Sequence, residues 1–253
     1  RAILPEQTIE NGLLKITLLE GKVGEIILSG NKWTRTSYIK KRLSGVKKGE
    51  LFNISVLEKD ILKINRYTDG VKLSGDLTPG KEFGTTDITL NTTETLPFHI
   101  TGLFDNAGRR TIGNLRGGIL VADDSLLGFR DKLTAGVYLS RSSVTPFADY
   151  NIPINSRDGR VGFTFSSSNA DVTRGDYTMF DISSRSLNYS LYYNQPIIRK
   201  PTFELNGFTS LNYKQATTSF DNVDTDRDKI SSLQLGLNAR YDTKKGIWYA
   251  SQS

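Results

Sequence analysis

Residues 233–242 run Leu233-Gln234-Leu235-Gly236-Leu237-Asn238-Ala239-Arg240-Tyr241-Asp242, an unbroken alternation of apolar residues with small, polar or charged ones. Successive side chains of a β-strand point to opposite faces, so this pattern predicts a strand with one apolar and one polar face. Similar alternation, over stretches of 6 to 12 residues, recurs at residues 133–140, 161–166, 187–194 and 203–214. The chain after Leu96 is therefore predicted to form a β-sheet.

Such alternation is typical of a soluble β-sandwich or of a membrane β-barrel, whereas a β-solenoid would show a short sequence period that is absent here. Segments of ~9–11 residues suit a tilted crossing of a bilayer, against ~5–6 in soluble sheets. Short turns at 155–159 and 242–246 contrast with long polar loops expected at 167–176 and 217–228, as in barrels. Aromatic residues toward segment ends suit an interfacial girdle: Tyr189, Tyr193, Tyr213, Tyr241, Trp248 and Tyr249.

The composition of the 253 residues excludes several classes of protein. Cysteine is absent and His99 is the single histidine, so disulfides, thiol catalysis and most zinc sites are excluded. The net charge of +6, with 27 acidic residues, gives no indication of nucleic-acid binding. The acidic stretch Asp221–Asp226 lacks the glycine and final glutamate of an EF-hand, and Gly117-Gly118 lies inside a predicted strand as a bend or close-packing point. We therefore expect no enzyme activity, no metal and no cofactor.

The first hundred residues predict an α+β module of order β-α-α-β-β over residues 22–96. Residues 22–31, 71–77 and 85–92 are typical of strands. A short helix capped by Thr36 or Ser37 is expected to run through Tyr38, Ile39 and Leu43 and to stop at Gly45. A second helix is expected to begin at Ser55, which forms a capping box with Glu58.

A weak internal repeat suggests a second module before this one. Leu4-Pro5 and Lys15-Ile16-Thr17-Leu18 are echoed by Leu77-Thr78-Pro79 and Asp87-Ile88-Thr89-Leu90, about 72 residues later. One interpretation is a tandem array, in which residues 1–21 are the last strand of a preceding module. Chance recurrence is the alternative.

Four charged residues fall on the polar side of the alternation: Arg116, Glu204, Lys214 and Arg240. One interpretation is structural, with salt bridges that order a wet interior. The other is functional, with mixed charge that forms the wall of a conduit for an unfolded polypeptide and keeps passing segments from sticking.

Short motifs in order along the chain resemble the two-partner secretion outer-membrane transporters (the TpsB family, ShlB/FhaC/HecB-like). Residues 1–21 resemble the end of a first POTRA domain and residues 22–96 resemble a second. Residues 97–253 resemble the first half of a barrel of about 16 strands. The motifs are Gly30-Asn31, Arg42-Leu43, Leu77-Thr78-Pro79-Gly80, Asp105-Asn106-Ala107-Gly108, Thr111-Ile112-Gly113, Leu126-Leu127-Gly128-Phe129-Arg130-Asp131 and Tyr150-Asn151-Ile152-Pro153.

The resemblance implies an α+β POTRA module followed by a transmembrane antiparallel β-barrel, incomplete in this chain. It implies a transporter in the outer membrane that exports a partner exoprotein, an adhesin or haemolysin, with the POTRA module in the periplasm. That module would capture the partner's N-terminal secretion domain, without nucleotide or nucleic acid. The side chains expected to face the guest are Val71, Lys72, Leu73, Ser74, Lys63 and Arg66, although lysine on an edge strand equally prevents aggregation.

About nine barrel strands are expected between Leu96 and Ser253, too few for a closed barrel. In the family pattern, the inward loop and the closing strand would follow Ser253, and the plug helix would precede Arg1. The chain is thus expected to be an internal portion of a protein about twice as long. Two alternatives stay open: a barrel-assembly factor of the same superfamily, and a soluble β-rich binding or adhesion protein with Leu133, Val137 and Leu235 buried against a second sheet.

Overall fold

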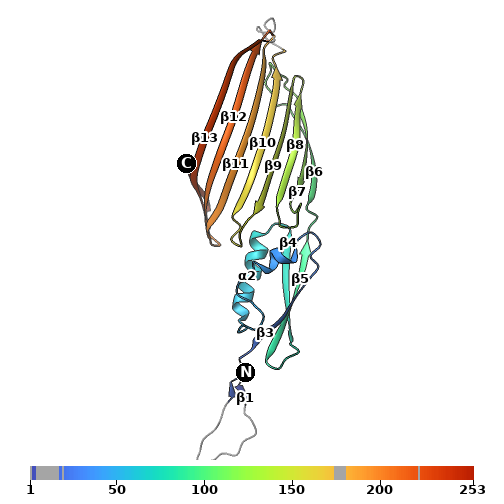
Figure 1. Cartoon of the computed structure of the whole chain (residues 1–253), viewed down its shortest axis with the longest axis vertical. Helices are drawn as coiled ribbons and strands as arrows, with labels where there is room; N and C mark the ends of the chain where they lie inside the picture. Colours follow the sequence, from blue (N-terminus) through green and yellow to red (C-terminus); the bar gives the residue numbers. More distant parts are fainter. Residues whose placement is uncertain (1, 4–16, 19, 174–180, 222) are drawn as a thin grey trace, which may run out of the picture. The chain divides into compact units, whose positions relative to one another are not determined.

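The computed structural model contains two compact units, residues 1–96 and 97–253 (Figure 1). A short pair of strands, β1 (Ala2–Ile3) and β2 (Thr17–Leu18), precedes the main part of the first unit. The residues that the structure describes are 2–3, 17–18, 20–173, 181–221 and 223–253. Most of the predicted repeat at residues 4–18 lies outside them.

The first unit has the order β-α-α-β-β. Its elements are β3 (Lys22–Ser29), α1 (Thr36–Lys40), α2 (Ile54–Tyr67), β4 (Val71–Pro79) and β5 (Thr85–Glu94). The sheet has the order β3-β5-β4, with β3 parallel and β4 antiparallel to the central strand, and α2 contacts β4. Its core consists mainly of aliphatic side chains, including Val23, Ile39, Leu57, Ile64, Val71, Leu73, Ile88 and Leu90.

Both predicted helix starts are wrong by one or two residues. The N-cap of α2 is Asn53, whose side-chain oxygen accepts the Ser55 backbone N–H at 3.0 Å. Ser55 therefore lies inside the first turn, because asparagine two residues earlier supplies the capping oxygen. Thr36 is already helical in α1, which ends at Lys40, so Leu43 lies beyond the helix.

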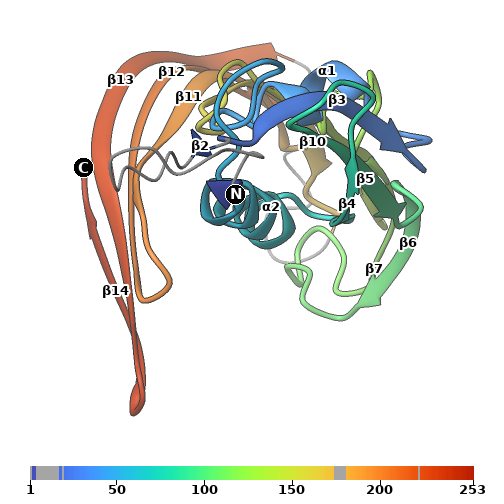
Figure 2. The ribbon, with the colours of Figure 1, turned by 90° about the horizontal axis from the view of Figure 1, so that it is seen from below.

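The second unit is one antiparallel sheet of nine strands, in which every strand pairs with its neighbours in the sequence. The order runs from β6 to β14 without a crossover, and β6 and β14 are the edge strands (Figure 2). The strands are β6 (Phe98–Asp105), β7 (Arg116–Asp123), β8 (Lys132–Ser140), β9 (Ser143–Pro153), β10 (Arg160–Asp171), β11 (Ser183–Arg199), β12 (Phe203–Phe220), β13 (Val223–Thr243) and β14 (Gly246–Gln252).

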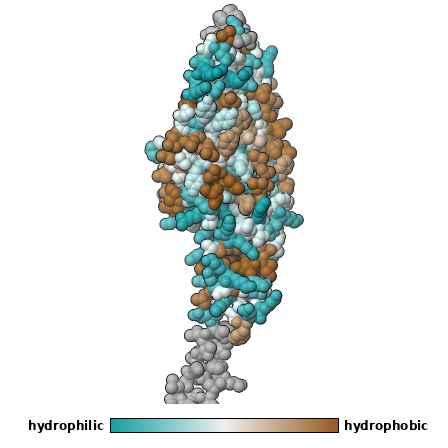
Figure 3. Space-filling model, viewed as in Figure 1, coloured by the Kyte–Doolittle hydropathy of each residue, from teal (hydrophilic) through white to brown (hydrophobic). Residues whose placement is uncertain are grey.

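Strand register gathers the apolar residues on one face of this sheet. Phe163, Leu191, Leu211 and Leu233 are successive partners across β10 to β13, with 46%, 51%, 56% and 62% of their surface exposed. Hydrophobic side chains form a belt across the middle of the unit in Figure 3, with hydrophilic residues above and below. Leu235, which the soluble-sandwich alternative would bury, is 63% exposed, because the described part of residues 97–253 forms a single sheet with no second one to pack on it.

Two rows of aromatic residues border this apolar face. One row pairs Phe203 with Tyr241 and Tyr241 with Trp248, and the other pairs Phe165 with Tyr189 and Tyr189 with Tyr213. Along β12 the rows are separated by about 33 Å of strand at ~3.3 Å per residue. With a strand tilt of ~40°, this corresponds to about 25 Å, the height of the apolar band of an outer-membrane barrel.

Three details of the strands differ from the sequence prediction. Residues 217–228 are not a loop, because β12 continues to Phe220 and β13 starts at Val223. Polar pairs hold this extension: the Ser219 hydroxyl donates to Asp224 at 2.8 Å and Arg227 donates to the same carboxylate at 3.0 Å. Likewise β10 runs to Asp171, inside the loop expected at 167–176, of which residues 174–176 lie outside the described residues. Tyr189 and Tyr213 consequently lie in mid-strand and mark the end of the apolar stretch.

No helix among the described residues is sufficiently long and apolar to span a membrane.

Candidate functional site

The face opposite the apolar belt carries the four charged residues singled out in the sequence. Strand register places Arg116, Glu204, Lys214 and Arg240 on it, and Glu204 is the direct cross-strand partner of Arg240. Their lining of a pore stays a prediction. Two of the cations are already engaged, because Arg116 forms a bidentate pair with Asp105 at 2.9 and 3.0 Å and Arg240 does so with Asp242 at 2.8 and 3.0 Å.

A network of hydrogen bonds holds other polar side chains against the same face. The Asp149 carboxylate on β9 accepts the Thr164 hydroxyl at 2.7 Å and the Tyr192 hydroxyl at 2.9 Å, which joins three strands. Further along, the Ser190 hydroxyl donates to Asn212 at 2.7 Å. These groups satisfy one another, so this polar wall is ordered by its own cross-strand contacts.

Every glycine in a strand of this polar face lies under an aromatic ring from the neighbouring strand, among the described residues. The register pairs are Gly118 with Tyr138, Gly136 with Phe147, Gly162 with Tyr192 and Gly236 with Phe208. A Cβ at Gly136 would lie 2.9 Å from the Phe147 ring, and one at Gly236 would lie 2.5 Å from the Phe208 ring. Glycine thus provides the space for each ring to lie along the wall, where a larger residue would push it outward.

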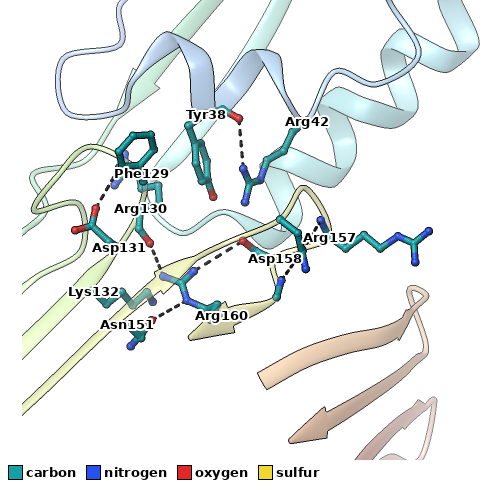
Figure 4. Close-up of polar contacts among 12 residues, drawn as sticks. Tyr38, Arg42, Phe129, Arg130, Asp131, Lys132, Asn151, Arg157, Asp158 and Arg160 are labelled. Carbon is teal, nitrogen blue, oxygen red and sulfur yellow. Dashed lines mark hydrogen bonds and ion pairs between the residues drawn. The ribbon is translucent and has the colours of Figure 1, made fainter. Parts of the chain in front are cut away.

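The turns at one end of the sheet are fixed by buried polar residues (Figure 4). Asp131, fully buried, accepts the backbone N–H groups of Leu127 at 2.9 Å and Phe129 at 3.1 Å. It also accepts the Tyr150 hydroxyl at 3.0 Å.

Arg160 connects this turn to the next one. Its guanidinium donates to the Arg130 carbonyl oxygen and to Asn151 Oδ1, the latter at 2.7 Å. Asp158 lies 3.8 Å from Arg160 and 3.3 Å from Arg199. Because carboxylates and guanidinium groups form strong charge-assisted bonds, these contacts tie β8 to β11 at their shared end.

The predicted docking residues of the first unit lie in different environments. Val71 and Leu73 are buried at 0% and 5% exposure, so they could offer a guest only their main chain, while Lys72 and Ser74 are exposed. Lys63 lies 3.8 Å from Asp60, and the Arg66 guanidinium is 5.7 Å from the centre of the Tyr67 ring.

Asn65, which no sequence pattern singled out, occupies part of the β4 edge. Its amide donates to the Leu73 carbonyl oxygen at 2.9 Å and accepts the Leu73 N–H at 2.6 Å. Lys72 Nζ donates to the Asn65 carbonyl oxygen at 2.7 Å. The Asn65 side chain therefore takes the place of a neighbouring strand at Leu73, which leaves Gly75 and Leu77 as the next positions whose main chain faces outward.

No group of acidic or histidine side chains among the described residues is arranged to hold a metal ion.

A β-α-α-β-β module joined to an antiparallel sheet with an apolar belt and a polar opposite face defines the class of POTRA-containing outer-membrane barrel proteins. Residues 84–253 match the family described as haemolysin secretion/activation protein ShlB/FhaC/HecB, and residues 21–70 match the POTRA family, surface antigen variable number repeat. The chain belongs to the ShlB/FhaC/HecB family. The resemblance and the fold class expected from the sequence are thereby confirmed, although the sheet is not closed.

Relatives of known type match along the chain. The heme/hemopexin transporter protein HuxB of Haemophilus influenzae (strain 86-028NP) is 30% identical over 100% of this chain and 45% of its own length. The outer membrane transporter CdiB of Dickeya dadantii (strain 3937) is 25% identical over 94% of this chain and 43% of its own length. The chain thus spans somewhat less than half the length of the curated relatives it matches.

Solved structures show the same fold. CdiB from Escherichia coli matches with a TM-score of 0.71 and 21% identity, covering 99% of this chain and 48% of that protein. BamA from Haemophilus ducreyi lacking POTRA domains 1–3 matches with a TM-score of 0.63 and 14% identity, covering 88% of this chain and 44% of that one.

Proposed function

We propose that this chain is part of an outer-membrane transporter that exports a partner exoprotein from the periplasm to the cell surface. Membership of the ShlB/FhaC/HecB family carries the proposal. The spacing of the two aromatic rows supports placement of residues 97–253 in the outer membrane, in contact with lipid. The POTRA module would then lie in the periplasm. The proposal assigns transport to the whole protein and no chemical reaction to this chain.

In this proposal the polar face of the sheet lines the path of the exported polypeptide. Arg116 and Arg240 each keep a carboxylate beside them, so the wall presents paired charges. Paired charges attract a passing charged segment less than isolated ones would, because the two fields largely cancel at a distance. Glu204 and Lys214 are the other two charged positions of this proposed lining.

The POTRA module receives the partner's secretion domain along the β4 edge in this proposal. An extended guest adds a strand through main-chain hydrogen bonds, and its side chains meet the exposed groups of the edge. Lys72, Ser74, Lys63 and Arg66 would contact those side chains, and Val71 and Leu73 would contribute main chain. The guest would have to displace Asn65 from Leu73 or pair beyond it, at Gly75 and Leu77.

Expression of the complete open reading frame with its partner exoprotein tests the transport role. We expect a heat-modifiable band in the outer-membrane fraction, and release of the partner to the surface or medium only when the transporter is present. A soluble periplasmic product, or partner release without the transporter, would contradict the proposal. A transporter deleted of residues 22–94 that still reaches the outer membrane is the matched control for the POTRA role, and it should not release the partner.

The fold match to BamA favours one alternative, a factor that inserts other barrels into the outer membrane. The two roles differ in the effect of depletion. A secretion transporter affects one partner, whereas an assembly factor lowers the amounts of many outer-membrane proteins. Quantitative proteomics of outer membranes after depletion therefore separates them.

A further inference from the structure

The POTRA sheet has a second edge, β3, whose outer side, away from β5, has main-chain partners only at its start among the described residues. The Val23 N–H donates to the Glu50 carbonyl oxygen at 2.8 Å, and the Gly49 N–H donates to the Val23 carbonyl oxygen at 2.8 Å. Beyond Val23 the outer edge of β3 has no strand partner in the described part of the chain. A groove of about 780 Å³ borders this stretch, which includes Glu25, Ile26 and Ile27.

The groove combines an apolar floor with a basic rim. The half-exposed Ile27 supplies apolar surface, and the almost fully buried Leu43 and Val46 also line the groove. Four lysines line the same groove, against a single acidic residue, Glu25. These lysines are Lys40, Lys41, Lys47 and Lys48.

The segment that carries the lysines is anchored to the core. Leu43 and Val46 are each 4% exposed, and the Gly45 N–H donates at 3.1 Å to Asp60, which is itself 3% exposed. The rim is thus held in place by buried contacts on both sides of Gly45. A preformed rim loses little conformational entropy when it binds a guest.

Most of the positive charge on the rim is not neutralised within the described part of the chain. Lys47 lies 3.5 Å from Glu50. Lys40, Lys41 and Lys48 are exposed and form no ion pair with any described residue. A guest that brings carboxylates would meet three unpaired ammonium groups next to a free strand edge.

The two edges of the sheet therefore differ. At β4 the Asn65 side chain already pairs with Leu73, whereas at β3 the stretch after Val23 is bordered by the groove of about 780 Å³. We propose that the β3 edge is a second docking site, which binds an extended acidic segment of the exported partner by strand addition. That the segment belongs to an exported partner rests on the transport function proposed above. That the β3 edge binds an extended acidic segment does not depend on that function.

Strand addition would use both the unpaired outer edge of β3 and the row of lysines beside it. Main-chain hydrogen bonds to β3 are indifferent to sequence, so specificity comes from side chains. Alternate side chains of a bound strand recur every ~6.6 Å on one side, within reach of a row of lysines. Exposed charge pairs are individually weak, at ~0.2–1 kcal/mol, so several carboxylates are needed and salt weakens binding.

Binding of a synthetic peptide to the full-length transporter in detergent tests the site without any secretion assay. The probe is a fluorescent 11-residue peptide that alternates Glu with Val; one control replaces every Glu by Lys, and another carries Pro at its centre. We expect the acidic peptide to bind, the basic one not to bind, and the Pro peptide to bind at least about tenfold more weakly because proline cannot continue the ladder. Equal binding of the Pro and acidic peptides would reduce the site to charge attraction and overturn the proposal.

A matched pair of variants locates the site. Lys40→Gln, Lys41→Gln and Lys48→Gln combined should weaken binding at least about tenfold. Lys32→Gln, Lys59→Gln and Lys81→Gln combined remove the same charge from the same unit outside the groove and should change binding by less than about twofold. Equal loss in both triples would overturn the proposal.

Disulfide trapping gives a second location readout. A peptide with one cysteine should crosslink to Ile27→Cys on β3, whether or not it also reaches Leu77→Cys on the β4 edge. Trapping at Leu77 alone would place the guest on the other edge and overturn the proposal. Failure of these tests while the same transporter still secretes its partner removes the second docking site and leaves the proposed function intact.

Discussion

The two units use β-sheets of opposite design. Among the described residues, every buried leucine, isoleucine, valine and aromatic side chain belongs to residues 1–96. In residues 97–253 the large hydrophobic side chains are partly or largely exposed, and the buried side chains include Arg130, Asp131 and Asp158. The first unit thus hides its apolar residues from water, whereas the second presents them outward, as a sheet does when its surroundings are lipid. The same strand alternation therefore has opposite meanings in different solvents.

The largest effect is expected from a cavity in the first unit. Ile88→Ala, at a fully buried position of the central strand, should lower the free energy of unfolding by about 2–5 kcal/mol. Leu62→Ala, at a side chain 66% exposed on α2, should change it by about 0.5 kcal/mol or less. Hydrogen–deuterium exchange of residues 85–94 measures both, and equal protection in the two variants would refute an apolar core here.

A charge placed on the apolar face of the second unit tests whether that face contacts lipid. Leu235→Arg, on the apolar face about midway between the two aromatic rows, should destabilise the lipid-embedded barrel by about 2–4 kcal/mol. Ser232→Arg lies on the polar face opposite and should have a much smaller effect, because its guanidinium can reach water. Urea unfolding of the complete protein in lipid vesicles is the measurement. A larger loss for Ser232→Arg would show that the two faces have been assigned in reverse.

Because aromatic rings lie over glycines on the polar face, mutations at a glycine and at its ring should have non-additive effects on stability. Gly162→Val should cost about 1–3 kcal/mol, because a side chain there overlaps the Tyr192 ring. In the double variant with Tyr192→Ala the overlap is removed, so the combined cost should be smaller than the sum of the two single costs. The thermal midpoint of heat modification on gels follows all three proteins. Strict additivity would mean that the ring does not rest on the glycine.

The smallest effect on stability is expected from removal of the Asn65 side-chain amide. Asn65→Ala leaves the outward N–H and C=O groups of Leu73 without their side-chain partner and should cost about 0.5–1.5 kcal/mol. It should also free the β4 edge, so a guest that adds a strand there should bind more tightly. Glu58→Ala, at an exposed position of the same helix outside the proposed docking residues, serves as the control for both measurements. Unchanged affinity after Asn65→Ala would argue against strand addition at Leu73.

The features that depend on alternation along one strand were predicted from the sequence. Contacts between side chains of different elements were not. Nine strands, their two faces and the β-α-α-β-β order follow from periodicity within each segment, and all are present. The contacts of Asn65 with Leu73 and of Asp149 with Tyr192 join different elements, so no local pattern revealed them. Residues 217–228 were predicted as a loop because they are polar on both faces and show no apolar alternation. The structure shows that β12 and β13 extend through this polar stretch.

Because each strand of the second unit pairs only with its neighbours along the chain, the sheet has a simple rule for growth. Insertion of one hairpin between two existing ones would add two strands and leave every other hairpin's internal register intact. The circumference of a closed barrel rises with the number of strands. Each gene segment that encodes one hairpin therefore adds a fixed increment to the circumference. Duplication or loss of such a segment would change the bore in even steps without rethreading the chain. Evolution can therefore adjust the size of such a protein by counting hairpins.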